Sequence, residues 1–200
     1  MSAILDRTSV RRDEFTHEDR GNLTSDGTRT FAFDLHNRLI SAFQSGVLDL
    51  ELSYDPLGRL RQVDTGAGVT QFLYDGDALV MEYNGANAIQ RRYAHGAGVD
   101  SPLIWYEGDG LGAEIWLYAD ERGSIVAEAY DGGTAAAYVY DAFGQPDAWS
   151  GSRFRYTGQI ALNDDLDARL YHYKARIYDP ALGRFLQTDP TLYAGGMNLY

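Results

Sequence analysis

The sequence predicts an all-β protein, a curled antiparallel sheet made of successive β-hairpins. The chain of 200 residues contains 15 Tyr and 22 Gly, a composition that favours sheets and tight turns over helices. Short segments alternate apolar and polar residues, as strands do. An aromatic residue followed by Asp also recurs at intervals of about twenty residues, which is typical of a repeated supersecondary unit.

The aromatic–Asp pairs mark the predicted turns. They are Phe33-Asp34, Tyr54-Asp55, Tyr74-Asp75, Tyr130-Asp131, Tyr140-Asp141 and Tyr178-Asp179. Asp can cap a turn with its carboxylate, and Gly accepts a positive φ. The sequence therefore predicts matching tight turns at Asp55–Gly58 and Asp141–Gly144, and a turn one residue longer at Asp179–Gly183.

The segments between the turns are predicted strands. The clearest are 69–74, 114–118, 125–130 and 137–140. Alternation within 114–118 predicts that Ile115 and Leu117 face one way and that Trp116 and Tyr118 face the other. Residues 171–178 are expected to form one strand, with a return strand at 184–187. The acidic segment 159–169 is expected to form an excursion before the strand at 171–178. No long stretch has a helical period, so any helix should be short.

Composition narrows the range of partners. The formal net charge is −12 without a concentrated basic patch, which argues against nucleic acid as the main partner. The absence of Cys excludes disulfides and thiolate metal sites. The four His residues are scattered without metal-ligand spacing, so neither a metal nor a cofactor is expected. The sequence shows neither a secretory signal nor an apolar run long enough to span a membrane.

The stretch 171–190, YHYKARIYDPALGRFLQTDP, followed by GGMNLY, resembles the core signature of RHS-repeat (YD-repeat) proteins. The resemblance is most specific over about the last thirty residues and extends through the upstream repeats. It implies a bacterial β-shell that encloses a C-terminal toxin, an architecture shared with the toxin-complex C subunit and the teneurin YD shell. Lys174 and Ile177 stand where the family more often has Arg and Tyr.

The resemblance also implies the organisation and the partners of the chain. Residues 1–150 are expected to form the hairpin sheet, and 151–200 the RHS-associated core segment at the end of a partial shell. The expected partners are the rest of a shell or a C-terminal toxin, with self-association through exposed sheet edges. The expected location is the bacterial cytoplasm, and export by a dedicated secretion system stays open.

Asp189 and Arg176 are the candidate catalytic residues. In the family, an Asp from the core motif pairs with a second Asp downstream, assisted by an Arg of the core strand, and the chain cuts itself. By motif these positions correspond to Asp189 and Arg176, whereas the later Asp-Pro-x-Gly motif is absent here. The alternative is a structural ion pair of Arg176 with Asp179 or Asp189, and this alternative is favoured for the chain alone.

Residues 64–67, Asp-Thr-Gly-Ala, have the form of an aspartic-protease loop. Such an enzyme needs two carboxylates that share a proton, and the sequence has no second copy of the loop. The same residues lie where a hairpin between Gln62 and Val69 must turn, so a structural turn is the favoured interpretation.

These observations predict a structural shell segment of a toxin-encapsulating protein rather than an enzyme. One alternative is catalytic, an aspartyl autoprotease or a glycosidase, and it predicts two carboxylates in contact within a cleft. Another alternative is a carbohydrate- or protein-binding module, which predicts an exposed aromatic patch without such a pair.

Overall fold

The computed structural model describes residues 15–98, 100–110, 112, 114–130, 132–133, 135–162, 169–190 and 200. Within these residues the fold is all-β, as predicted. Thirteen strands form one antiparallel sheet, here called the outer sheet, and four more form the inner sheet. In both sheets the spatial order of the strands is their order in the sequence, so each strand pairs with the next by a hairpin.

The outer sheet is a continuous meander. Its strands are β1 (Phe15–His17), β2 (Leu23–Asp26), β3 (Arg29–Phe33), β4 (Leu39–Gln44), β5 (Val47–Tyr54), β6 (Leu60–Asp64), β7 (Val69–Asp75), β8 (Ala78–Asn84), β9 (Ile89–His95), β10 (Pro102–Glu107), β11 (Glu114–Ala119), β12 (Ile125–Tyr130) and β13 (Ala135–Ala137). The inner sheet contains β14 (Ile160–Ala161), β15 (Tyr171–Tyr173), β16 (Arg176–Asp179) and β17 (Arg184–Phe185). A single 3₁₀ turn, Tyr156–Gly158, is the one helical element among the described residues.

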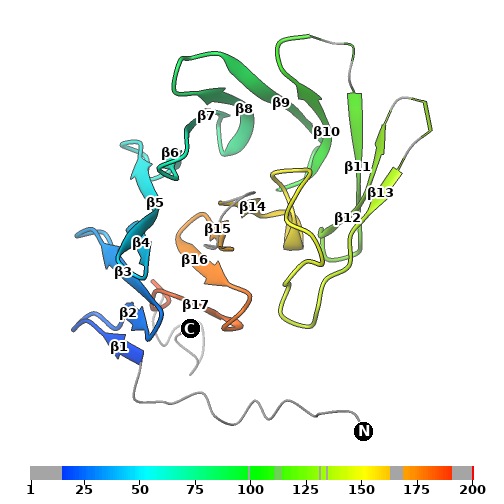
Figure 1. Ribbon diagram of the computed structural model, residues 1–200. Coiled ribbons are helices and arrows are strands. Elements are labelled where there is room, and N and C mark those ends of the chain that lie inside the picture. The colour runs from blue at the N-terminus through cyan, green and yellow to red at the C-terminus, as the bar shows by residue number, and fades with distance from the viewer. Residues whose placement is uncertain are drawn as a thin grey trace, which may run out of the picture.

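The outer sheet curls into an arc, and the inner sheet lies inside it (Figure 1). Many neighbouring strands shift register by a β-bulge, including β3–β4, β5–β6 and β7–β8. Bulges bend a strand and increase its twist, so their repetition accounts for a sheet that curls rather than lying flat. The bulges stand beside the aromatic–Asp turns, which places the curvature at the repeat itself.

Alternation along each strand decides which side chains face the inner sheet. In β11, Ile115 and Leu117 are 7% and 6% exposed, whereas Trp116 and Tyr118 are 46% and 54% exposed. The predicted orientation of this strand is therefore confirmed. The same period places a row of apolar residues on the concave side of the outer sheet.

One hydrophobic core joins the two sheets. The outer sheet contributes, among others, Leu23, Leu39, Leu50, Leu60, Leu79 and Ile125, and Phe154, Leu162, Leu170, Ile177 and Leu186 join the cluster from the C-terminal part of the chain. Removing an apolar side chain from water stabilises a fold by about 1.5–3 kcal/mol for a residue of this size. The curl of the outer sheet thus depends on the inner sheet that it packs against.

Two predictions for the inner sheet are wrong. Residues 171–178 form a hairpin rather than one strand, because Lys174 takes a φ of +56° and the chain turns between β15 and β16. The turn at Lys174 and Ala175 contains no Gly, Asn or Pro, so the sequence gives no turn signal. Within the expected excursion 159–169, Ile160 and Ala161 instead form β14, which pairs with β15; residues 163–168 lie outside the described part.

Candidate functional site

The turn at Asp55 has the predicted geometry. Asp55 Oδ1 accepts hydrogen bonds from the backbone N–H of Leu57 and of Arg59, both at 2.9 Å. Arg59 Nε donates to the other oxygen at 2.7 Å, and Gly58 has a φ of +85°. Partial desolvation opposes ionisation, but the hydrogen bonds and charge of Arg59 outweigh it and hold the pKa of Asp55 below its usual value.

The turn at Asp141 matches it. Asp141 Oδ1 accepts from the N–H of Phe143 at 2.8 Å and of Gln145 at 3.0 Å, and Gly144 has a φ of +86°. A side chain at Gly144 would also collide with the ring of Tyr156. This glycine is needed both for its backbone conformation and for close packing against the C-terminal segment.

The turn at Asp179 is longer, as predicted, and it carries a second interaction. Asp179 Oδ1 accepts from the N–H of Ala181 at 2.8 Å, and Gly183 has a φ of +66°. The fully buried Asp179 carboxylate also pairs with Arg29 of β3, which in turn binds Asp26 at 2.6 Å. Burial disfavours the guanidinium charge, but the two carboxylates outweigh burial and raise the pKa of Arg29.

The structure places Arg176 and Asp189 in contact. Arg176 Nη2 lies 3.1 Å from Asp189 Oδ2, and the two side chains are 20% and 21% exposed. The guanidinium of Arg176 also lies 3.7 Å from the centre of the Phe185 ring. The pairing of β16 with β17 brings the segment after Gly183 back beside Arg176, as expected. Asp179 pairs with Arg29 instead, so of the two carboxylates considered for Arg176 it is Asp189 that forms the ion pair.

The Asp64–Ala67 loop is a structural turn. Asp64 Oδ1 accepts from the N–H of Gly66 at 2.8 Å, and Gly66 has a φ of +74°. This loop joins β6 to β7, where Gln62 faces Gln71. The carboxylate is therefore used to hold the turn, as favoured from the sequence.

A buried ion pair between the sheets was not anticipated from the sequence. Glu82 of β8 is 1% exposed, and Arg153 donates to its two carboxylate oxygens at 3.1 and 3.0 Å. Tyr93 donates a further hydrogen bond to Glu82. Burial alone would raise the pKa of Glu82, but the charge of Arg153 outweighs it and lowers the pKa. No local spacing could pair residues 71 positions apart.

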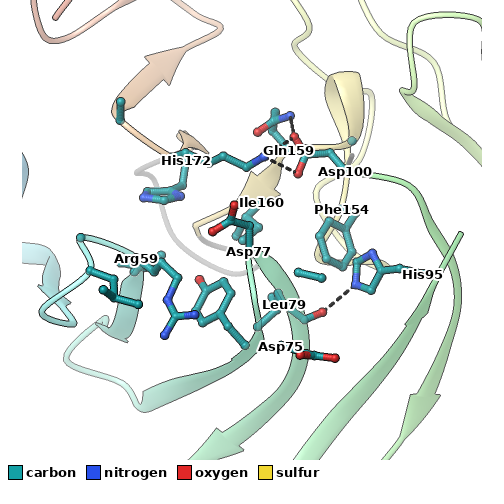
Figure 2. A pocket seen from close by; sticks show the side chains of 18 of the residues that line it. Arg59, Asp75, Asp77, Leu79, His95, Asp100, Phe154, Gln159, Ile160 and His172 are labelled. Atoms are coloured by element: carbon teal, nitrogen blue, oxygen red, sulfur yellow. Dashed lines mark hydrogen bonds and ion pairs between the residues drawn. The ribbon is translucent and has the colours of Figure 1, made fainter. Parts of the chain in front are cut away.

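A cavity of about 540 Å³ lies between the outer and inner sheets (Figure 2). Its lining includes Leu60, Leu79, Phe154, Ile160 and His172. In the sequence, His172 is one of four scattered histidines. Whether its side chain points inward depends on how β15 pairs with other strands, and the sequence pattern does not show that pairing. Within the described residues, no group of three or more His, Asp or Glu side chains could hold a metal ion.

Exposed aromatic side chains lie on the opposite face of the outer sheet. Trp116 and Tyr118 of β11 are about half exposed. In the described part of the chain, no helix has both the length and the hydropathy that crossing a membrane requires.

Curated bacterial proteins resemble the chain over nearly its full length. The tRNA3(Ser)-specific nuclease WapA of Bacillus spizizenii is 30% identical over 203 residues, which covers 96% of this chain but 8% of WapA. The double-stranded DNA deaminase toxin A of Burkholderia cenocepacia is 26% identical over 230 residues, covering 93% of this chain and 16% of that toxin. The chain thus spans less than a fifth of either relative.

The fold is shared with solved toxin-complex structures. The crystal structure of TcdB2-TccC3-Cdc42 superposes with a TM-score of 0.62 at 18% identity, covering 93% of this chain and 11% of that chain. The teneurin YD-shell family profile matches residues 6–196. Together with the aromatic–Asp turns and the curled meander, this match shows that the chain belongs to the teneurin YD-shell family of RHS/YD-repeat shell proteins.

Proposed function

We propose that the chain forms a wall segment of a β-shell that encloses a toxin polypeptide, and that its inner sheet is the inward-turning part of that shell. The observation that carries this proposal is the arc of thirteen strands wrapped around the inner sheet (Figure 1). Relatives named as a nuclease and a deaminase toxin support a toxin as the enclosed cargo. By itself, the 200-residue chain acts as a scaffold rather than as an enzyme.

The proposed division of labour follows the two sheets. Residues 1–150 supply the hairpin wall, and residues 151–200 supply the core segment. Both parts contribute side chains to one hydrophobic core, so the two proposed parts differ in role but pack as one unit. The formal charge of −12 disfavours a phosphate backbone, so the proposed cargo is a protein and not a nucleic acid.

We further propose that Asp189 and Arg176 form part of an aspartyl self-cleavage site. Such chemistry needs two carboxylates, one protonated to act as the acid and one ionised to activate water. Arg176 Nη2 lies 3.1 Å from Asp189 Oδ2, so a positive charge faces the carboxylate proposed as the base. The protonated partner would come from a later Asp-Pro-x-Gly motif of a longer chain.

We propose that the shell folds around its cargo in the bacterial cytoplasm. Delivery would then use a dedicated secretion system.

The edges of the outer sheet provide the test of the wall proposal. Within the described residues, β1 and β13 each have a strand neighbour on one side only. In a shell, such edges continue into further strands, and in isolation they pair with another copy. We therefore expect the average mass of the 200-residue chain to rise with concentration in light scattering at about 0.5 M salt, where screening weakens charge repulsion. A monodisperse monomer at high concentration would contradict the proposal.

The alternation of hydrogen bonds in β13 supplies a matched pair of variants. Tyr138 N–H donates to Val126 O at 2.8 Å. Because hydrogen bonds alternate along an antiparallel pair, the N–H of Ala136 points to β12, whereas the N–H of Ala137 points to the open edge. Ala137→Pro removes that outward donor and should reduce association without loss of stability. Ala136→Pro breaks the pairing with β12 and should lower the melting temperature. Association unchanged in Ala137→Pro would exclude β13 as the contact.

A further inference from the structure

The turn between β8 and β9 has the hydrogen bonds of an aromatic–Asp turn, but an amide stands in place of the acid. Asn84 Oδ1 accepts from the backbone N–H of Ala86 and of Ala88, both at 3.0 Å. Asn84 N–H donates to Ala88 O, and Asn87 N–H donates to Asn84 O, both at 2.9 Å. Asn87 has a φ of +61°. Asn84 therefore occupies the position that an acid has in the other repeats.

The Asp55 turn shows the same set of bonds. Asp55 Oδ1 accepts from the backbone N–H of Leu57 and of Arg59, both at 2.9 Å. Asp55 N–H donates to Arg59 O, and Gly58 N–H donates to Asp55 O, both at 2.9 Å. Asn and Asp can both build such a turn because either side chain offers a carbonyl-type oxygen to the backbone. The backbone of the Asn84 turn therefore already has the form that an aspartate would require.

Gly85 follows Asn84 and leaves a backbone nitrogen open to attack the side chain. Gly85, Ala86 and Asn87 are all exposed. Within the described part of the chain, neither the backbone N–H of Gly85 nor the Nδ2 of Asn84 donates a hydrogen bond. Glycine has no Cβ, so its nitrogen meets little steric hindrance when it approaches the side-chain carbon of the preceding residue.

The turn also activates the carbon that this nitrogen would attack. When a nucleophile adds to Asn84 Cγ, negative charge develops on Oδ1. That oxygen already accepts from the backbone N–H of Ala86 and of Ala88. Preorganised N–H donors at a developing oxyanion are the means by which enzymes stabilise tetrahedral intermediates. The carbonyl is thus polarised by the turn, while the amide that must leave is not held.

We propose that Asn84 is a site of spontaneous modification, where the amide converts to a carboxylate and completes an aromatic–Asp turn after Tyr83. The Gly85 nitrogen gives its proton to solvent and bonds to Asn84 Cγ; the Cγ–Nδ2 bond breaks, and ammonia leaves with a proton from solvent. Water then breaks the new bond between Cγ and the Gly85 nitrogen, which regains its proton. One water is consumed and one ammonia released, with no oxidant or reductant. The carboxylate can accept from the same two N–H groups, and charge strengthens these bonds.

Incubation of the folded 200-residue chain at neutral pH, followed by intact-mass spectrometry and peptide mapping, tests the proposal. We expect progressive loss of the Asn84 amide, with aspartate at this position as a product. Asn87 is the internal control, because it lies in the same exposed turn but is followed by Ala88, so it should keep its amide. A sample unfolded in urea shows whether the fold permits or prevents the reaction.

Variants of Gly85 assign the attacking atom. Gly85→Pro removes the N–H and should abolish the loss of the amide; Pro56 stands at the matching position after Asp55, so a turn of this kind accepts proline. Gly85→Ala should slow the loss and serves if the proline variant does not fold, since Ala142 stands at the matching position after Asp141. Gly68→Ala is the control and should leave the rate unchanged, because a Cβ there meets nothing within 4 Å.

The product has its own measurable consequence. Asn84→Asp should unfold at a higher urea concentration than the unaltered chain, because charge-assisted bonds then hold the turn. The proposal is overturned if Asn84 keeps its amide in the folded chain, or if Gly85→Ala loses the amide as fast as the unaltered chain. It is also overturned if mapping finds only the β-linked isomer, whose altered backbone displaces the carboxylate from the turn, or if Asn84→Asp is no more stable.

Discussion

Asp55 illustrates what the repeated acid does for its neighbours. One carboxylate oxygen closes the turn, and the other holds Arg59, whose guanidinium lies 5.1 Å from the centre of the Tyr74 ring. In the preceding repeat, Arg38 is held by Asp34 and lies 4.6 Å from the ring of Tyr54. Each Arg therefore connects the turn that fixes it to the aromatic residue of the next repeat. Cation–π contacts of this kind contribute about 0.5–2 kcal/mol each.

Gly58→Val should destabilise the protein by about 1 kcal/mol or more. A β-branched residue is strained at the φ of +85° that the Asp55 turn requires. The free energy of unfolding from urea titration measures the effect. Gly68→Val is the control, because Gly68 is absent from the positive-φ glycines and a Cβ there meets nothing within 4 Å. Equal losses in the two variants would show that the turn conformation is not the cause.

His172 should make stability depend on pH below neutrality. Its pKa is about 6.5 in the unfolded chain and about 4 in the fold. The unfolded state therefore binds a proton first as the pH falls, so this contribution is complete above pH 6.5 and is lost progressively towards pH 4. Between pH 7 and pH 5 we expect a loss of about 2 kcal/mol from this residue.

Urea titrations at the two pH values test this expectation. His172→Leu removes the titrating group and should show a correspondingly smaller change between pH 7 and pH 5. Indistinguishable pH profiles for the two proteins would mean that His172 is protonated equally in the folded and unfolded states.

At the residue scale, the sequence predicts local chemistry well. The acid-to-glycine spacing predicts the turns of Asp55 and Asp141, because turn capping depends on residues close in the chain. It does not predict Glu82 with Arg153, because that contact depends on how the sheet curls. The contact of Arg176 with Asp189 was expected from the family motif, and its role in cleavage stays a prediction.

Among the elements, the hairpin β16–β17 is bound most directly to the start of the chain. Asp179 of β16 pairs with Arg29 of β3, and Leu23 N–H donates to Leu186 O at 2.8 Å. Tyr200 adds a hydrogen bond from its hydroxyl to Gly21 O at 2.9 Å. The C-terminal hairpin therefore holds the first strands of the arc against the inner sheet.

Arg29→Met should cost about 3 kcal/mol of unfolding free energy. The change leaves the buried carboxylates of Asp179 and Asp26 without their shared cation, and unpaired buried charges are strongly destabilising. Arg122→Met is the matched control, because its ion pair with Asp120 is exposed and such pairs contribute little. A small loss for Arg29→Met, equal to that of the control, would argue against this link between the two sheets.

Strand prediction succeeded where alternation and turn residues agree, as in β7, β11 and β12. It failed at the β15–β16 hairpin, where Lys174 and Ala175 turn without a turn-type residue. It also failed at Ile160 and Ala161, whose pairing with β15 is decided by packing and not by local composition. A short strand within a core carries too few residues for a period to be recognised.

For the whole molecule, the sequence predicts the curled hairpin meander, and the structure shows what accompanies the curl, namely the bulges and the packing on the inner sheet.

The self-cleavage proposal predicts that the 200-residue chain stays intact. A graft of a family-like tail ending in Asp-Pro-x-Gly after Tyr200 should restore cleavage, and Asp189→Asn in the graft should abolish it. Asp19→Asn, at an exposed acid, is the control and should leave cleavage unchanged. Intact-mass spectrometry reads each outcome. Cleavage of the ungrafted chain would place the catalytic pair elsewhere, and cleavage that survives Asp189→Asn would make Asp189 structural.

The consecutive strand order has a consequence for how the chain reaches its fold. Every strand of the outer sheet pairs with a segment that leaves the ribosome next to it, so the wall can assemble hairpin by hairpin during synthesis. The contacts of Asp179 with Arg29 span 150 positions and must wait for the end of the chain. Synthesis would therefore produce an open arc first, with its apolar inner face uncovered, and the last hairpins would close it.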